Sequence, residues 1–166
     1  MIAVALTDPK YPHNVAGAYR ASAAWGASRL LVSGQRVARE LPGMKRLPRE
    51  ERMRINQQEV TLDWTDRIFD ETPGLVPVAV EVLESAVPLT YFQHPENALY
   101  VFGPEDGSVP SVMLRHCHQF VIIPSDHCLN LACAVNVVLA DRRMKRQRDG
   151  IEPVFPSART MFEERG

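Results

Sequence analysis

The sequence has few of the residues and patterns that define several large protein classes. Three cysteines occur in 166 residues, Cys117, Cys128 and Cys133, and this odd number without regular spacing fits a reducing compartment, not a disulfide framework. No apolar run approaches the roughly 20 residues that span a bilayer. The first residues, Met1 to Asp8, show no basic leader of a signal peptide. We therefore expect a cytoplasmic protein with no membrane contact.

Motifs for common cofactors and metals are also missing. No GxGxxG follows a strand-like run and no GxxxxGK[ST] occurs, so a nicotinamide or nucleoside triphosphate enzyme has no support. The histidines and cysteines of the last third lack the spacing of a structural zinc site, and we expect no metal. No recognisable motif places a histidine and an acidic residue with Cys128, so we do not expect its thiol to act as a nucleophile. The residues considered for zinc are His116, Cys117, His118, His127, Cys128 and Cys133.

Charge is nearly balanced over the whole chain but uneven along it. The net charge is -1, and a content of 23% charged and 45% hydrophobic residues is ordinary for a globular protein. Two basic stretches suggest a polyanionic partner, although basic residues near a helix C-terminus also complement its dipole and most charge runs are solvated. The stretches contain Arg36, Arg39, Lys45, Arg46, Arg49, Arg52 and Arg54, and then Arg142, Arg143, Lys145, Arg146 and Arg148.

Apolar runs alternate with helical patterns along the chain. This alternation predicts an α/β domain over residues 1–150, with a mostly parallel sheet and helices on both faces, followed by a C-terminal extension over 151–166. Asn14 is a natural N-cap for the first helix and Gly26 a natural stop. Strands are expected at 2–6, 30–32, 75–82, 99–102 and 120–123, helices at 14–25, 111–115 and 129–148, an apolar segment at 64–69, and a loop at 35–58 with a short helix at 49–56.

Two predicted strands end in polar loops that precede helices. The run 99–102 ends in Gly103-Pro104-Glu105, and the run 120–123 ends at Pro124, before a polar segment that leads into the helix near Leu129. In open α/β sheets, small ligands bind in the crevice beyond the carboxyl ends of the strands, where helix N-termini and loop amides supply hydrogen bonds. The sequence therefore predicts a ligand site where these two strand ends and the helix start converge.

Three short motifs carry a family resemblance. They are Asn14-Val15-Ala16-Gly17-Ala18-Tyr19-Arg20 followed by Trp25-Gly26, then Leu99 to Glu105, and then Cys128-Leu129-Asn130-Leu131-Ala132 followed by Ala134-Val135. In order and separation they resemble the motifs of the SpoU (TrmH-like) RNA ribose 2′-O-methyltransferases of the SPOUT superfamily. The resemblance covers residues 1 to about 148 and is greatest to the minimal members that modify the tRNA wobble nucleotide.

The resemblance implies a fold, a cofactor and an assembly. Family members form a deep trefoil knot with the C-terminal segment, bind S-adenosylmethionine in the knot, and place the site at the interface of a homodimer. It implies that the substrate is RNA, most simply tRNA. In the first basic stretch, Arg46, Arg49 and Arg52 are then expected to contact RNA phosphates. Carried onto this chain, the cofactor-binding residues are Phe102, Gly103, Ile122, Ile123, Leu129 and Leu131, and the catalytic residues are Asn14, Arg20, Glu105, Cys128 and Asn130.

Arg20 is the residue expected to act on the ribose hydroxyl. Because a guanidinium stays protonated in proteins, we expect Arg20 to stabilise the developing alkoxide while a phosphate oxygen or water takes the proton. Glu105 is expected to hold Arg20 in a bidentate pair, with Asn14 and Asn130 orienting the partners. Cys128 stands where the family has serine, and a thiol is the weaker hydrogen-bonding group. The alternative is therefore a non-catalytic member that binds cofactor or RNA. Ala16 and Ser108 stand where family members have glycine.

Overall fold

A seven-stranded sheet forms the centre of the molecule. The computed structural model describes residues 1–39 and 60–154, and all six strand pairings among them are parallel, in the order β3-β2-β1-β6-β4-β7-β5. The strands are β1 (Ile2–Thr7), β2 (Arg29–Ser33), β3 (Thr61–Trp64), β4 (Val76–Val80), β5 (Val87–Pro88), β6 (Ala98–Phe102) and β7 (Gln119–Ile122). The helices are α1 (Pro12–Ala24), α2 (Arg36–Arg39), the 3-10 turn η1 (Leu89–Tyr91), α5 (Ser111–Leu114) and α6 (Leu131–Arg148).

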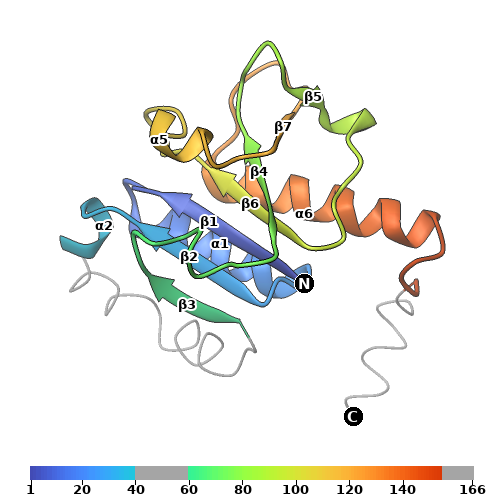
Figure 1. The fold of residues 1–166 in the computed structure, drawn as a ribbon, viewed down its shortest axis with the longest axis horizontal. Coiled ribbons are helices and arrows are strands. Elements are labelled where there is room, and N and C mark those ends of the chain that lie inside the picture. The colour runs from blue at the N-terminus through green and yellow to red at the C-terminus, as the bar shows by residue number, and fades with distance from the viewer. Residues whose placement is uncertain (40–59, 155–166) are drawn as a thin grey trace.

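Both faces of the sheet are covered, which explains why the central strands are continuously apolar. Every residue of β1 and β6 is buried, as expected when parallel strands are covered on both sides. The long helices α1 and α6 pack side by side on one face, behind the sheet in Figure 1. On the opposite face, the residues beneath the short helix α5 and the 65–75 segment form a second, smaller apolar cluster around Leu99, Val101 and Ile68.

The ends of the two long helices are set by local sequence. Helix α1 begins at Pro12 with Tyr11 as its N-cap residue, because proline at the first helical position lacks only an N–H that would have no partner in the helix. The prediction that Asn14 caps this helix is therefore wrong. Gly26 adopts φ +78° just after the helix, which confirms it as the stop. Helix α6 begins at Leu131, and the Asn130 side chain caps it by accepting from the amides of Ala132 (2.9 Å) and Cys133 (3.3 Å).

The contact between α1 and α6 depends on a small residue. A Cβ atom built on Gly17 would lie 2.7 Å from the Cβ of Ala132, closer than real Cβ contacts. Gly17 thus lets the first turn of α6 approach α1 directly. This packing brings two of the sequence motifs together, since Gly17 belongs to the first motif and Ala132 to the third.

The parallel α/β sheet is confirmed, and the predicted element ends differ from the observed ones by a few residues. The apolar segment 64–69 forms the end of β3 and a turn, while β5 and α2 were not predicted as elements. The predicted helix at 49–56 lies outside the described residues. The trefoil knot that the family resemblance implies stays a prediction.

The basic residues at the end of α6 are paired within the protein. Arg142 is buried and donates to the Glu96 carbonyl at 2.8 Å, while Arg143 and Arg146 contact the Glu152 carboxylate at 2.9 and 2.5 Å. Glu152 therefore docks the start of the C-terminal extension against α6. Arg142, Arg143 and Arg146 are thus held within the protein, whereas Arg148 at the end of the helix is 69% exposed and pairs with its neighbour Asp149.

Candidate functional site

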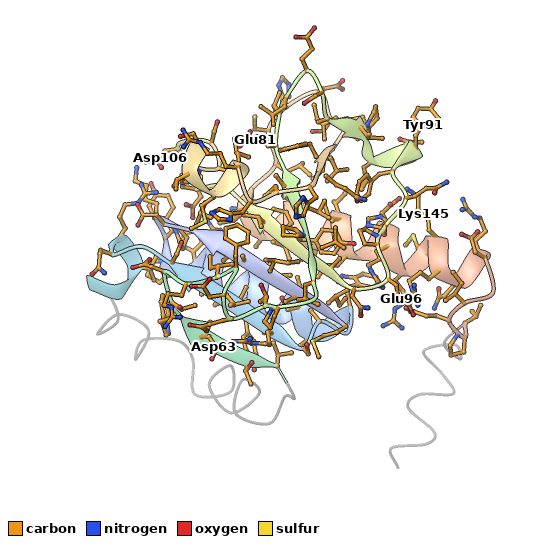
Figure 2. The ribbon with its side chains drawn as sticks, in the orientation of Figure 1. Asp63, Glu81, Tyr91, Glu96, Asp106 and Lys145 are labelled. Carbon is orange, nitrogen blue, oxygen red and sulfur yellow. The ribbon has the colours of Figure 1, made fainter. Side chains whose placement is uncertain are left out.

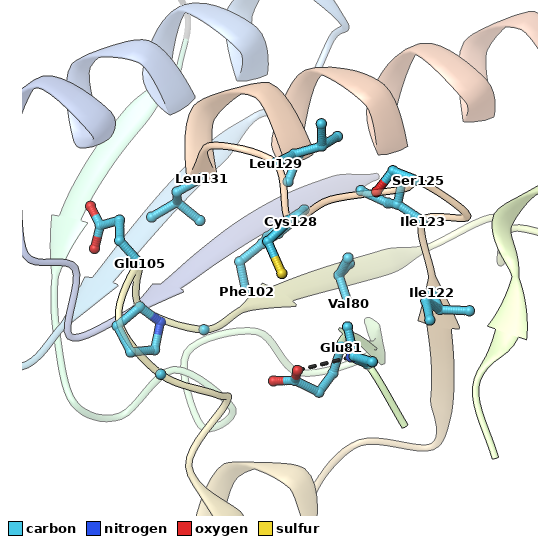
Figure 3. A pocket seen from close by; sticks show the side chains of 15 residues that line it. Val80, Glu81, Phe102, Glu105, Ile122, Ile123, Ser125, Cys128, Leu129 and Leu131 are labelled. Carbon is cyan, nitrogen blue, oxygen red and sulfur yellow. Dashed lines mark hydrogen bonds between the residues drawn. The ribbon is translucent and has the colours of Figure 1, made fainter. Parts of the chain in front are cut away.

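A cavity of about 180 Å³ lies beyond the carboxyl ends of three neighbouring strands. Strand β4 lies between β6 and β7, and Val80 pairs with Phe102 on one side and Val121 on the other, so the three strands end at the same level. The segment before α6 closes the cavity from above in Figure 3. The lining residues are Val80, Glu81, Val82, Phe102, Gly103, Pro104, Glu105, Gly107, Ile122, Ile123, Ser125, Cys128, Leu129, Leu131 and Ala134.

The cavity gathers most of the residues singled out in the sequence. All six predicted cofactor-binding residues line it, namely Phe102, Gly103, Ile122, Ile123, Leu129 and Leu131. Two predicted catalytic residues, Glu105 and Cys128, line it as well, and the Cys128 sulfur points into it (Figure 3). The wall is largely apolar, which suits a flat heteroaromatic group, and the polar groups are few.

Gly103 allows the loop after β6 to fold back on itself. A Cβ atom at this position would lie 2.7 Å from the Val109 nitrogen and 2.8 Å from the Ser108 carbonyl carbon. Because both neighbours are backbone atoms, a larger residue would push the loop away from the strand end. The glycine therefore shapes the floor of the cavity through the loop that it accommodates.

Three predicted catalytic residues form one hydrogen-bonded chain. The Asn14 side-chain amide donates to Glu105 Oε1 at 2.6 Å, and Asn14 Oδ1 accepts from Asn130 Nδ2 at 2.8 Å. Asn14 is only 2% exposed, so both of its polar ends are satisfied away from water. The chain connects the start of α1, the loop after β6 and the start of α6.

Glu105 is held as a carboxylate by this environment. Burial raises its pKa, but hydrogen bonds from the Asn14 side chain and from the amides of Lys10 (2.7 Å) and Tyr11 (3.3 Å) outweigh burial, and the net pKa lies below the ordinary value. The expected bidentate pair between Arg20 and Glu105 stays a prediction. Arg20 lies on α1 six residues after Asn14, is exposed, and does not line the cavity of its own chain.

The sequence did not identify Glu81 as a site residue. Its carboxylate accepts from the amides of Val82 (2.8 Å) and Val109 (2.7 Å), and it extends along the floor of the cavity in Figure 3. A glutamate inside the predicted apolar run 75–82 was a visible signal in the sequence. Its meaning depended on the strand order, because only the placement of β4 between β6 and β7 brings Glu81 to the cavity.

Other expectations concern groups away from the cavity. Arg46, Arg49 and Arg52 lie outside the described residues. Within residues 1–39 and 60–154, no group of three or more histidine, cysteine, aspartate or glutamate residues is placed to hold a metal ion. No helix in this same part of the chain is long and apolar enough to cross a membrane.

A match to a known family model establishes the family of this chain. A model described as "SpoU rRNA Methylase family" matches residues 1–140. The chain belongs to the SpoU family. The match includes all three motifs that carried the resemblance, and this confirms the family prediction. No curated protein matches the chain.

Solved structures of SpoU proteins share the fold. The A. aeolicus TrmH/SpoU tRNA modifying enzyme superimposes with a TM-score of 0.73 at 17% identity, covering 98% of this chain and 86% of that one. A protein studied for the 2-OH methylation of C/U34 on tRNA gives a TM-score of 0.64 at 22% identity, covering 90% and 97%. AviRb from Streptomyces viridochromogenes, a SpoU methyltransferase, gives 0.64 at 20% identity, and the chain spans 61% of its length. At these identities the likeness concerns the fold.

Proposed function

We propose that this SpoU chain is an S-adenosylmethionine-dependent RNA methyltransferase that transfers a methyl group to a ribose 2′-hydroxyl, most simply of tRNA. The observation that carries the proposal is the coincidence of the apolar cavity with the Asn14–Glu105–Asn130 chain at its edge. AviRb and a Sinorhizobium meliloti rRNA methyltransferase both have structures with AdoMet bound, which supports the cofactor. The C/U34 protein covers nearly the same length as this chain, which supports tRNA.

The residues of the cavity fit the cofactor. Ile122, Leu129 and Leu131 offer an apolar wall for an adenine ring, while the backbone around Gly103 offers hydrogen-bonding groups. When bound, S-adenosylmethionine supplies an electrophilic methyl group on a sulfonium. The protein's own task is to hold the ribose oxygen in line with that methyl group and to stabilise the oxygen as its proton leaves.

Arg20 performs the stabilising task in this proposal, and it does so across a dimer. Since Glu105 is occupied by Asn14 and two backbone amides, the role of Asn14, Glu105 and Asn130 is to fix the loops around the cavity. The Arg20 guanidinium of the partner subunit then faces the ribose, and its fixed positive charge favours the alkoxide. The proton passes to a phosphate oxygen of the RNA or to water.

An exposed apolar face on α6 supports the homodimer. Val137 and Met144 are 37% and 61% exposed on this helix. Lys145 of the same helix reaches towards η1 (Figure 2), where it donates to the Leu89 carbonyl. A groove of about 670 Å³ runs between η1 and α6. Single exposed apolar residues are ordinary, whereas a helix face with an adjoining groove suits a self-complementary contact.

A non-catalytic SpoU member is the second candidate, and Cys128 is the observation that favours it. The thiol points into the cavity where the family has serine, so it offers the RNA a weak hydrogen bond. Replacing Cys128 with serine tests this reading, because the side chains are nearly isosteric. An inactive wild type with an active Cys128→Ser variant would select the binding protein.

The enzyme proposal is tested by methyl transfer to RNA. Purified chain is incubated with unfractionated tRNA and isotope-labelled S-adenosylmethionine, and the digested nucleosides are separated and weighed by mass spectrometry. A 2′-O-methylated nucleoside is the expected product. Labelled cofactor that binds without any labelled nucleoside, from tRNA or from ribosomal RNA offered in parallel, contradicts the proposal and selects the non-catalytic reading.

A further inference from the structure

The charges in the cavity are of one sign. Of the described residues that line it, two carry charge, Glu81 and Glu105, and both are acidic. Glu105 is placed at the edge by the chain through Asn14 and Asn130, whereas Glu81 leaves the end of β4 and lies on the floor. No lysine, arginine or histidine is among the described lining residues. A cavity of this kind favours a cation over a neutral ligand of the same shape.

Glu81 is fixed in place while keeping its charge available. Each carboxylate oxygen accepts one backbone amide, from Val82 for Oε1 and from Val109 for Oε2, which leaves further acceptor capacity on both. The surrounding side chains of Val80, Phe102 and Ile122 are apolar, so water screens the carboxylate less than at an open surface. The negative charge therefore acts on whatever occupies the cavity.

We propose that Glu81 makes the cavity selective for the positively charged form of the cofactor over its neutral demethylated form. The inference rests on the proposed function. S-Adenosylmethionine carries one positive charge more than S-adenosylhomocysteine, because the methyl group leaves with the C–S bond broken and the electron pair kept on sulfur. Attraction between the sulfonium and Glu81 is therefore present before transfer and absent after it, while the amino-acid part of the ligand is unchanged. The carboxylate helps to load the methyl donor and to release the product.

The test is calorimetric binding of three ligands to the full chain. They are S-adenosylmethionine, S-adenosylhomocysteine and sinefungin, an unreactive analogue with an ammonium group near the position of the sulfonium. In Glu81→Gln we expect both cationic ligands to lose about tenfold in affinity relative to S-adenosylhomocysteine, roughly 1.4 kcal/mol. Glu84→Gln is the matched control, since Glu84 is an exposed glutamate three residues further on that does not line the cavity.

The competing role for Glu81 is structural, because its hydrogen bond from the Val109 amide links the end of β4 to the loop before Val109. Loss of a purely structural contact would lower the affinity for all three ligands equally. That result, or unchanged affinities, overturns the proposal. Glu81→Asp separates the roles further, because it keeps the charge while shortening the reach to the Val109 amide. It should preserve the preference for the cations even where overall affinity falls, and a lost preference in Glu81→Asp would also contradict the proposal.

The outcomes also separate this inference from the proposed function. Suppose that the wild type binds S-adenosylmethionine and methylates RNA, and that Glu81→Gln keeps the wild-type ratio of S-adenosylmethionine to S-adenosylhomocysteine affinity. Then only the charge selection fails. If the wild type binds none of the three ligands, the cofactor assignment fails, and the selection by Glu81 fails with it.

Discussion

At the scale of the residue, Arg20 carries the charge on which the proposed reaction depends. Arg20→Ala should keep the affinity for S-adenosylmethionine and lose turnover, because the guanidinium acts on the ribose oxygen and shares the sign of the sulfonium. Loss of one group that stabilises a developing oxyanion costs a hundredfold to a thousandfold in rate. Single-turnover methyl transfer measures the loss, and calorimetry measures cofactor affinity.

An exposed arginine elsewhere gives the control for this prediction. Arg67 is 76% exposed and pairs with Asp70 at 3.3 Å, away from the cavity, so Arg67→Ala should leave turnover unchanged. Near-normal turnover in Arg20→Ala removes Arg20 from the mechanism. A lowered cofactor affinity in that variant would instead give Arg20 a role in binding.

Glu105 contributes a pH-dependent part of the stability. Its pKa in the folded protein lies below the ordinary 4.5, because the bonds from Asn14 and two amides outweigh burial, so folding favours the charged form. The contribution is complete above about pH 4.5 and is lost as the pH falls through the lower folded pKa. Glu105→Gln should therefore be less stable than wild type near pH 7, and the difference should shrink towards acid.

Urea unfolding at a series of pH values between 3 and 7 measures this difference. Glu84→Gln serves as a control, since the Glu84 side chain is exposed. Its free energy of unfolding should vary with pH in parallel with that of the wild type. If the free energies of unfolding of Glu105→Gln and wild type differed by a constant amount over the whole series, the hydrogen bonds to Glu105 would not favour its charged form.

At the scale of the element, the approach of α6 to α1 depends on Gly17. At an exposed position inside a helix, alanine normally makes the helix more stable than glycine does, by about 1 kcal/mol. Gly17→Ala should instead destabilise by about 1–3 kcal/mol, because the new Cβ would meet the Ala132 Cβ at 2.7 Å and overpack the contact. Urea unfolding gives the sign of the change in the free energy of unfolding, and a second substitution, Ala132→Gly, should recover part of the lost stability. A stabilised Gly17→Ala protein contradicts the described packing.

The sequence was informative about elements and less informative about their order. Apolar runs identified the strands β1, β4, β6 and β7, since hydrophobic runs and the prolines and glycines that flank them are local signals. The placement of β4 between β6 and β7 depends on long-range pairing, which leaves no local trace. Glu81 was therefore missed, whereas Gly103 and Leu131 were found through the family motifs. Asn14 was predicted both as a helix cap and as a catalytic residue. Its hydrogen bonds to Glu105 and from Asn130 have no local sequence signal, because these partners are distant in the sequence.

At the scale of the whole molecule, the proposed dimer places Arg20 at the cavity of the other subunit. Met144→Glu puts a charge into the exposed α6 face and should give a monomer by light scattering. That monomer should bind S-adenosylmethionine and lose methyl transfer, because Arg20 no longer reaches a ribose. Val112→Glu is the matched control, since Val112 is also 61% exposed but lies on α5, over the opposite face of the sheet. A fully active Met144→Glu monomer contradicts the shared site.

The most direct test of the account asks which oxygen of the RNA receives the methyl group. A 2′-O-methyl group blocks attack of that oxygen on the adjacent phosphate, so alkali leaves a dinucleotide uncut at the modified position. Unfractionated tRNA labelled by the wild-type chain should release its label as alkali-stable dinucleotides, and tRNA treated with Arg20→Ala should contain little label. Label that appears in mononucleotides would place the methyl group on a base and would contradict ribose methylation.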